Sequence, residues 1–189
     1  SLSPKIEQAA EIIVSSCKKR GVIYFIGNGG SAADAQHLAA ELEGRQYRIR
    51  PPLKAYALTN TSTITSVSND YSYNDVFARV LARTINHEDV LVAISTSGSS
   101  ENIIKGMKQA KERGAFVIAF TGETEGKMKD NSDLLINIPS KDTARVQEGY
   151  MVIGHILCDI VERELFADLN KAVFIDRDGT INIDKEQSN

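Results

Sequence analysis

The stretch Val22-Ile-Tyr-Phe-Ile26-Gly27-Asn-Gly-Gly-Ser31 decides the fold of this chain. Its apolar run predicts a buried strand over 22–26, its glycines predict a tight turn, and the residues that follow predict a helix over 32–43. A strand that runs through a glycine-rich turn into a helix is typical of parallel α/β sheets. The turn also presents backbone N–H groups at a helix N-terminus, where anions bind.

The rest of the chain repeats this alternation of strands and helices. Pro4 and Gly21 bracket a first helix, and Gly114 should close a later one in the left-handed conformation. Further strands are expected over 54–58, 89–94, 115–120, 133–138 and, near the end, 171–175, and further helices over 61–68, 75–85, 101–113 and 143–166. Because the strands are continuous apolar runs, helices should cover both faces of the sheet. We predict an α/β fold: a doubly wound three-layer sandwich with a five-stranded parallel sheet.

Length and composition limit the class of protein. The chain has 189 residues, 42% hydrophobic content and a net charge of −3, which suits one globular domain with a full core. The absence of a basic patch gives no reason to expect a nucleic-acid partner, and no apolar run has the length of a membrane span. The first residues, Ser1–Lys5, do not have the pattern of a signal peptide, and we expect none. Cys17 and Cys158 are too few and too far apart for a disulfide framework, so we expect a reduced, cytoplasmic protein.

Two polar loops should lie together, because the carboxyl ends of parallel strands meet at one edge of a sheet. Gly27–Ala32 fits the loose dinucleotide pattern G-x-G-x-x-A, but no carboxylate follows the strand over 54–58 to hold a ribose. The second loop offers four hydroxyls at a helix N-terminus, from Ser95, Thr96, Ser97 and Ser100. A single serine is usually a turn or cap residue, whereas this group favours a monophosphate site without Lys or Arg.

Four polar side chains on two helices form a second candidate site. His37 and Glu41, four residues apart, share one helix face, and Gln147 and His155, eight apart, share a face to within about 80°. Together they could hold a zinc ion with an open position. Alternatively, Glu41 could be a general base and His155 a general acid, or all four could be ordinary surface and core residues. The third histidine, His87, lies in a polar turn and is expected at the surface.

These motifs resemble those of a known family. Gly27–Ser31, Ser95–Ser100 and Thr143–Glu148 are similar to the motifs of sugar-isomerase (SIS) domains, and most closely to phosphoheptose isomerases, over about residues 5–166. The resemblance implies a flavodoxin-like doubly wound fold and a homotetramer. It also implies conversion of sedoheptulose 7-phosphate into D-glycero-D-manno-heptose 7-phosphate, the first step of nucleotide-activated heptose biosynthesis for lipopolysaccharide or surface glycans.

The resemblance also assigns roles to single residues. Glu41 matches the base that moves a proton between C1 and C2 through an enediol, and His155 matches its acid/base partner, which helps to open the sugar ring. A zinc site of the family matches His37, Glu41, Gln147 and His155, and zinc would polarise the carbonyl. Arg45 sits where the family has an arginine near the site. The implied substrate ligands are Asn28, Gly29, Gly30, Ser31, Asp70, Ser95, Thr96, Ser97, Ser100 and Gln147.

A second function is open at this point: a non-catalytic SIS module that binds a sugar phosphate or a protein such as the replication initiator. A related SIS protein of that kind keeps the glycine and serine loops but lacks the glutamate and histidine at positions 41 and 155. Both residues are present in this chain, which favours an enzyme.

Both ends of the chain depart from the family pattern. Family members usually carry about one more helix before the region that matches residue 5, and that helix packs in the tetramer. At the other end, Lys171–Asn182 resembles the first motif of haloacid-dehalogenase-type phosphatases, closest to heptose bisphosphate phosphatase, with Asp176 as nucleophile and Asp178 as acid/base. We expect residues 1–167 to form the isomerase domain. Residues 168–189 are expected to be the truncated start of a phosphatase domain from a longer fused protein, without activity alone.

Overall fold

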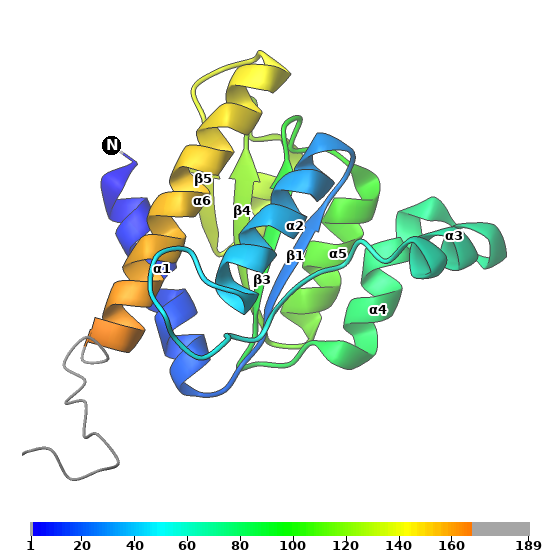
Figure 1. Ribbon diagram of the computed structural model, residues 1–189. Coiled ribbons are helices and arrows are strands. Elements are labelled where there is room, and N and C mark those ends of the chain that lie inside the picture. The colour runs from blue at the N-terminus through cyan, green and yellow to red at the C-terminus, as the bar shows by residue number, and fades with distance from the viewer. Residues whose placement is uncertain (1, 168–189) are drawn as a thin grey trace, which may run out of the picture.

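Five parallel strands form the centre of the computed structural model, which describes residues 2–167 (Figure 1). They lie in the order β2-β1-β3-β4-β5, and every neighbouring pair is parallel. The strands are β1 (Ile23–Gly27), β2 (Ala55–Ala57), β3 (Val90–Ser95), β4 (Phe116–Thr121) and β5 (Leu134–Asn137). This order confirms the doubly wound, flavodoxin-like prediction, and it places the change of direction between β1 and β3.

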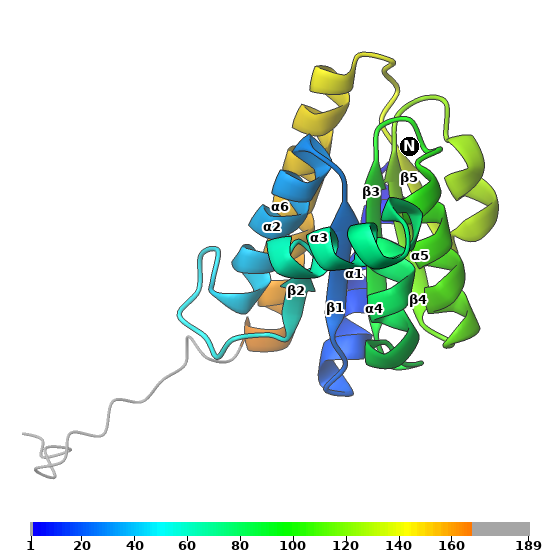
Figure 2. The ribbon, with the colours of Figure 1, turned by 90° about the vertical axis from the view of Figure 1, so that its right-hand side faces the viewer.

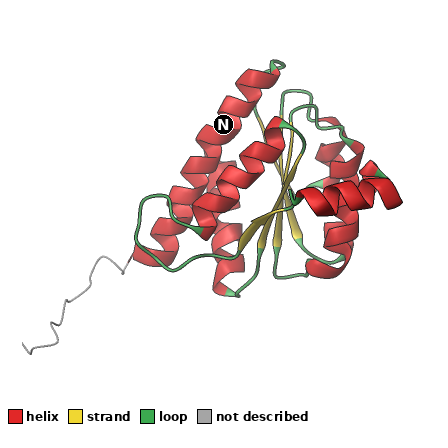
Figure 3. Ribbon diagram, turned by 45° about the vertical axis from the view of Figure 1, so that its right-hand side comes forward, coloured by secondary structure: helices red, strands yellow, loops and turns green. Residues whose placement is uncertain are grey.

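Helices cover both faces of the sheet, so that it lies between two helical layers (Figures 2 and 3). One face packs against α1 (Ser3–Lys18), α2 (Gly30–Glu43) and α6 (Thr143–Phe166), and the other against α4 (Val76–Thr84) and α5 (Glu101–Glu112). Successive residues of β1 alternate between these layers, with Ile23 and Phe25 in the first core and Tyr24 and Ile26 in the second. This double coverage is why the strands are continuous apolar runs.

The remaining elements differ somewhat from the sequence prediction. The helix expected over 75–85 is present as α4, and a short turn, η1 (Tyr73–Asp75), precedes it, where the hydroxyl of Ser72 accepts a hydrogen bond from the N–H of Asn74 at 3.1 Å. Helix α3 (Thr61–Asp70) projects from the sandwich (Figure 1), and η2 (Gly126–Asn131) was not predicted.

Two chain reversals test the predicted helix ends. Gly114 has φ 82°, which confirms its left-handed position after α5. After α1, however, Arg20 and not Gly21 takes the left-handed conformation, with φ 65°. Gly21 is needed for space instead, because a Cβ there would collide with the carbonyl oxygen of Glu88.

The second domain predicted for the chain falls outside the described residues, as do the strand expected over 171–175 and the phosphatase-like motif. Among residues 2–167, no helix is long and apolar enough to cross a membrane.

Candidate active site

The glycine turn and the serine loop lie side by side at the carboxyl edge of the sheet, as predicted. Gly27 pairs with Ile94 across β1 and β3, so the two loops leave the sheet at the same level. In the serine loop, Oγ of Ser95 lies 3.2 Å from Oγ of Ser100 and 3.4 Å from Oγ of Ser97. These hydroxyls gather at the N-terminus of α5, where backbone N–H groups and the helix dipole favour an anion.

A surface pocket extends from the serine loop to the loops that follow β4 and β5. Its polar lining comes from Thr96, Ser97, Ser99, Thr124, Ser140, Lys141 and Thr143. The predicted monophosphate site contained no basic residue, whereas Lys141 adds a cation to this pocket. The sequence offers no local sign of this, because Lys141 lies 44 residues from Ser97 in the chain.

Two glycines hold the serine loop against the start of η2. Gly98 and Gly126 both have left-handed backbones, with φ 64° and φ 55°. A Cβ on Gly126 would collide with the carbonyl oxygen of Gly98, which also accepts a hydrogen bond from the N–H of Met128 at 3.0 Å. Only glycine permits this approach without strain, so the backbone itself fixes the shape of the loop.

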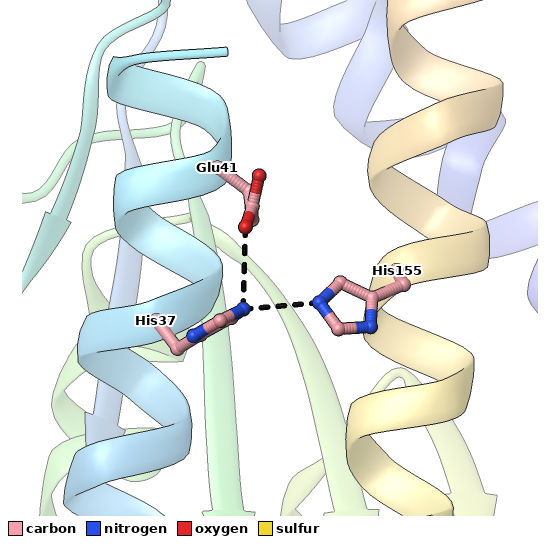
Figure 4. Close-up of side chains that lie close together, drawn as sticks. All are labelled: His37, Glu41 and His155. Atoms are coloured by element: carbon pink, nitrogen blue, oxygen red, sulfur yellow. Dashed lines mark hydrogen bonds and ion pairs between the residues drawn. The ribbon is translucent and has the colours of Figure 1, made fainter. Parts of the chain in front are cut away.

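Three of the four residues proposed for a metal come together between α2 and α6 (Figure 4). Nε2 of His37 lies 3.0 Å from Nε2 of His155 and 3.2 Å from Oε1 of Glu41. One ligand atom from each of the three residues lies within 4.8 Å of the others. Four tetrahedral ligands at about 2.0–2.1 Å from zinc are separated by about 3.3–3.4 Å. The donor types and the two shortest separations therefore fit a zinc ion.

Gln147 lies near the start of α6, beside the start of α2. It precedes His155 by about 12 Å along α6, and a Cβ on Gly30 would collide with its Nε2. Because Gly30 begins α2, the side chain of Gln147 lies beside the glycine turn. This position suits a substrate ligand, while its place among the zinc ligands stays a prediction.

The other predicted residues are spread along the same edge. Ser31 is buried at the start of α2, and the amide of Asn28 bonds to Asn102 and Tyr73. Asp70 is exposed at the end of α3. Its carboxylate accepts a hydrogen bond from Nδ2 of Asn69 at 3.0 Å, and no hydrogen bond within residues 2–167 joins it to the other predicted ligands. Arg45 is exposed after α2, and His87 is exposed as predicted.

Behind the cluster, two polar groups lie between α2 and α6. Asp34 is one turn before His37, and its Oδ2 is buried without a hydrogen-bond partner among the described residues. Burial raises the pKa of Asp34, while the charge of His37 opposes the shift. The hydroxyl of Tyr150 is likewise buried and unpaired within 2–167, and burial raises its pKa well above the ordinary value, with a further contribution from Asp34. The two helices that carry the cluster therefore also carry two buried polar atoms without a partner among the described residues.

A buried ion pair that the sequence did not reveal holds the segment after Glu41. The side chains of Arg50 and Glu162 are both 0% exposed, with Nε and Oε1 2.8 Å apart. Arg50 also donates to the carbonyl oxygens of Glu41 at 2.8 Å and Leu42 at 2.9 Å, which closes the last turn of α2. The pair therefore anchors the end of the helix that carries the candidate base.

Glu162 makes three further hydrogen bonds, to the backbone N–H groups of Gln46, Tyr47 and Arg48 at 2.9–3.1 Å. Burial alone would raise the pKa of Glu162. The three N–H donors and Arg50 outweigh burial, so the pKa lies below its ordinary value.

Comparison with known proteins agrees with this geometry. Residues 1–122 match the SIS domain family. A phosphoheptose isomerase of Rhodospirillum rubrum is 48% identical over 164 residues, which cover 86% of this chain and 87% of that protein. The chain belongs to the phosphoheptose isomerase family of SIS-domain proteins.

Solved structures of this family share the fold. A phosphoheptose isomerase from Neisseria gonorrhoeae has a TM-score of 0.79 at 42% identity, over 85% of this chain and 86% of that one. One from Francisella tularensis has a TM-score of 0.81 at 38% identity, over the same shares of the two chains. The fold and the family inferred from the sequence motifs are thus confirmed.

Proposed function

We propose that this chain is an aldose–ketose isomerase that converts sedoheptulose 7-phosphate into D-glycero-D-manno-heptose 7-phosphate, the first step of nucleotide-activated heptose biosynthesis. The family supports the reaction type. The observation that carries the proposal is the His37–Glu41–His155 cluster, in which α6 brings His155 to the two residues of the helix that begins at the glycine turn. A chain that only bound a sugar phosphate would need the loops but not this cluster.

The side chains of the cluster suit a proton transfer between adjacent carbons. In the proposed reaction, the carboxylate of Glu41 removes a proton from C1 of the ketose and a cis-enediol forms. Glu41, whose proton can exchange with solvent at the enediol stage, then delivers a proton to C2 to give the aldose, while His155 moves a proton between the two oxygens. Glu41 is partly buried, with 21% of its side chain exposed, so substrate can reach the carboxylate while the surrounding helices limit water.

His37, Glu41 and His155, with Gln147 as the fourth ligand, would hold a zinc ion. When bound, zinc would polarise the substrate carbonyl. The serine loop and Lys141 would bind the 7-phosphate, since several hydroxyl side chains and one lysine line that pocket. Along α2, Gly30 and His37 are about 10 Å apart, so phosphate binding would lie near the start of the helix and the chemistry about two turns further along it.

We further propose a homotetramer in the cytoplasm. Apolar side chains support the assembly, because Val152 and Ile156 on α6 are 61% and 43% exposed, and Tyr47 and Ile49 are 69% and 86% exposed. The free thiols of Cys17 and Cys158 agree with a reducing compartment. We retain the interpretation of 168–189 as the start of a phosphatase domain as a proposal.

The test is direct. Incubation with sedoheptulose 7-phosphate and zinc, followed by NMR, should show the anomeric proton of the aldose product appearing with time. A tetrameric, zinc-loaded sample that binds the ketose and never forms the aldose would refute the isomerase and leave the non-catalytic binding module.

A further inference from the structure

The side-chain amide of Asn28 is hydrogen-bonded to a buried residue of α5. Asn28 lies in the glycine turn after β1, and Asn102 is the second residue of α5, where it is 2% exposed. Nδ2 of Asn28 donates to Oδ1 of Asn102 at 2.8 Å, and Nδ2 of Asn102 donates to Oδ1 of Asn28 at 2.9 Å. This reciprocal pair joins the glycine turn to the helix that follows the serine loop.

A backbone group decides which way both amides face. The N–H of Ile103 donates to Oδ1 of Asn102 at 2.9 Å, and a backbone N–H can only donate. The oxygen of Asn102 must therefore occupy that position, which turns its nitrogen toward Asn28. Asn28 must then present its oxygen to that nitrogen, because two amide nitrogens cannot satisfy each other.

Tyr73 fills the remaining acceptor position of Asn28. Its hydroxyl, in η1, donates to Oδ1 of Asn28 at 2.8 Å. An amide side chain has two acceptor lone pairs and two N–H donors. Asn102 and Tyr73 together occupy both lone pairs and one N–H of Asn28. One N–H has no partner among the described residues, and Asn28 is only half-buried, so a ligand can reach it.

We propose that Asn102 is a positioning residue that acts through Asn28 and leaves a single amide N–H as the group offered to the substrate. The inference rests on the proposed function, in which Asn28 contacts the sugar phosphate. An N–H donor requires an acceptor, so the matching substrate atom is a hydroxyl, carbonyl or phosphate oxygen. A protonated amine at that place would meet only a donor, and the site would select against an amino sugar phosphate.

The substitution Asn102→Asp tests this positioning without removing volume. The carboxylate still accepts from Ile103 and from Nδ2 of Asn28, and a negative charge in the first turn of α5 is favourable for the helix. Only the N–H donated to Oδ1 of Asn28 is lost, so two oxygens face each other in either orientation of the Asn28 amide and residue 102 no longer fixes that orientation. The KM for sedoheptulose 7-phosphate should rise on the order of tenfold, with kcat changed less than about threefold.

Two further variants calibrate this result. Tyr73→Phe removes one of the two bonds to Oδ1 of Asn28 and keeps the Asn102 pair, so KM should rise by only about threefold. Asn86→Asp is the matched control at the opposite edge of the sheet, where Oδ1 accepts from the N–H of Glu88 at 2.9 Å and an aspartate can do the same. It should leave KM and kcat unchanged.

A second measurement is independent of turnover. In protein labelled with ¹⁵N-asparagine, the side-chain amide resonances of Asn28 should shift in Asn102→Asp and stay in place in Asn86→Asp. If Asn102→Asp leaves both KM and these resonances unchanged, or lowers kcat with KM intact, the positioning role is wrong. If the wild-type protein shows no turnover, the proposed function fails instead. The resonances and calorimetric binding of the ketose phosphate then still decide the role of Asn102.

Discussion

Glu162→Gln should destabilise the fold far more than an ordinary helix substitution. Each carboxylate oxygen of Glu162 meets two donors: Oε1 meets Arg50 Nε at 2.8 Å and Gln46 N at 2.9 Å, and Oε2 meets Tyr47 N and Arg48 N, both at 3.1 Å. Whichever way a glutamine amide is turned, its NH₂ group faces two donors. Two hydrogen bonds are lost and the Arg50 charge is left buried, which should cost about 3–5 kcal/mol.

Urea unfolding followed by circular dichroism, at one fixed protein concentration, measures this loss. For a chain of this size the cost corresponds to a fall in Tm of about 6–20 °C. Glu164→Gln is the matched control, because Glu164 is exposed on the same helix and should change stability by less than about 0.5 kcal/mol. Equal stability of the two variants would contradict the account of the buried pair.

The same carboxylate predicts a pH dependence. The pKa of Glu162 is lower in the folded protein than in the unfolded chain, so the unfolded state binds more protons in acid. Its contribution is complete above the unfolded pKa of about 4.3 and is lost as pH falls through the folded pKa. Below about pH 4.3, wild-type stability should therefore fall more steeply than that of Glu162→Gln, and parallel acid limbs would contradict this.

Two other predictions concern the ligand sites. His155→Ala should lower zinc affinity at least about tenfold, measured by metal analysis after dialysis, and should reduce turnover. His87→Ala should change neither zinc affinity nor turnover. Unchanged metal content in His155→Ala would remove His155 from the ligand set. Gly126→Ala should weaken binding of a phosphate ester in calorimetry, because the left-handed backbone costs about 1–2 kcal/mol and the new Cβ pushes on the carbonyl of Gly98. Gly114→Ala carries similar backbone strain at the far edge of the sheet, so it should lower stability without affecting phosphate-ester binding. Equal losses of binding in the two variants would contradict the proposal that Gly126 shapes the serine loop.

Much of the fold could be predicted because its signals are local. The central strands are buried on both faces and are apolar over almost their whole length, and the five strands alternate with helices. The errors arise where a single side chain shifts a boundary. The hydroxyl of Ser72 caps the short turn η1 before α4, and Arg20 takes the left-handed position in place of the glycine beside it.

The candidate site could be predicted only in part. His37 and Glu41 share a helix face by spacing, and the serines gather in one loop, so their residue types and periods are visible in the sequence. In the sequence, Glu162 has the pattern of an ordinary solvent-exposed charge on a helix. Its partner Arg50 is 112 residues away, so no local pattern indicates that the two pair. Asn102 has no pattern either, because its importance comes from pairing with Asn28, 74 residues earlier. Contacts between segments far apart in the chain produce no periodic pattern in the sequence, so they could not be predicted from it.

The measurement that tests the central claim most directly compares isomerisation in D₂O by the wild-type protein and by Glu41→Gln. In D₂O with sedoheptulose 7-phosphate, the wild-type protein should form the aldose and exchange solvent deuterium at the transferred position, followed by ¹H NMR. Glu41→Gln should lose this activity by about 10²–10⁴-fold while binding the phosphate ester within a few-fold of wild type. A Glu41→Gln protein that isomerises the ketose at the full rate would contradict the assignment of Glu41 as the base.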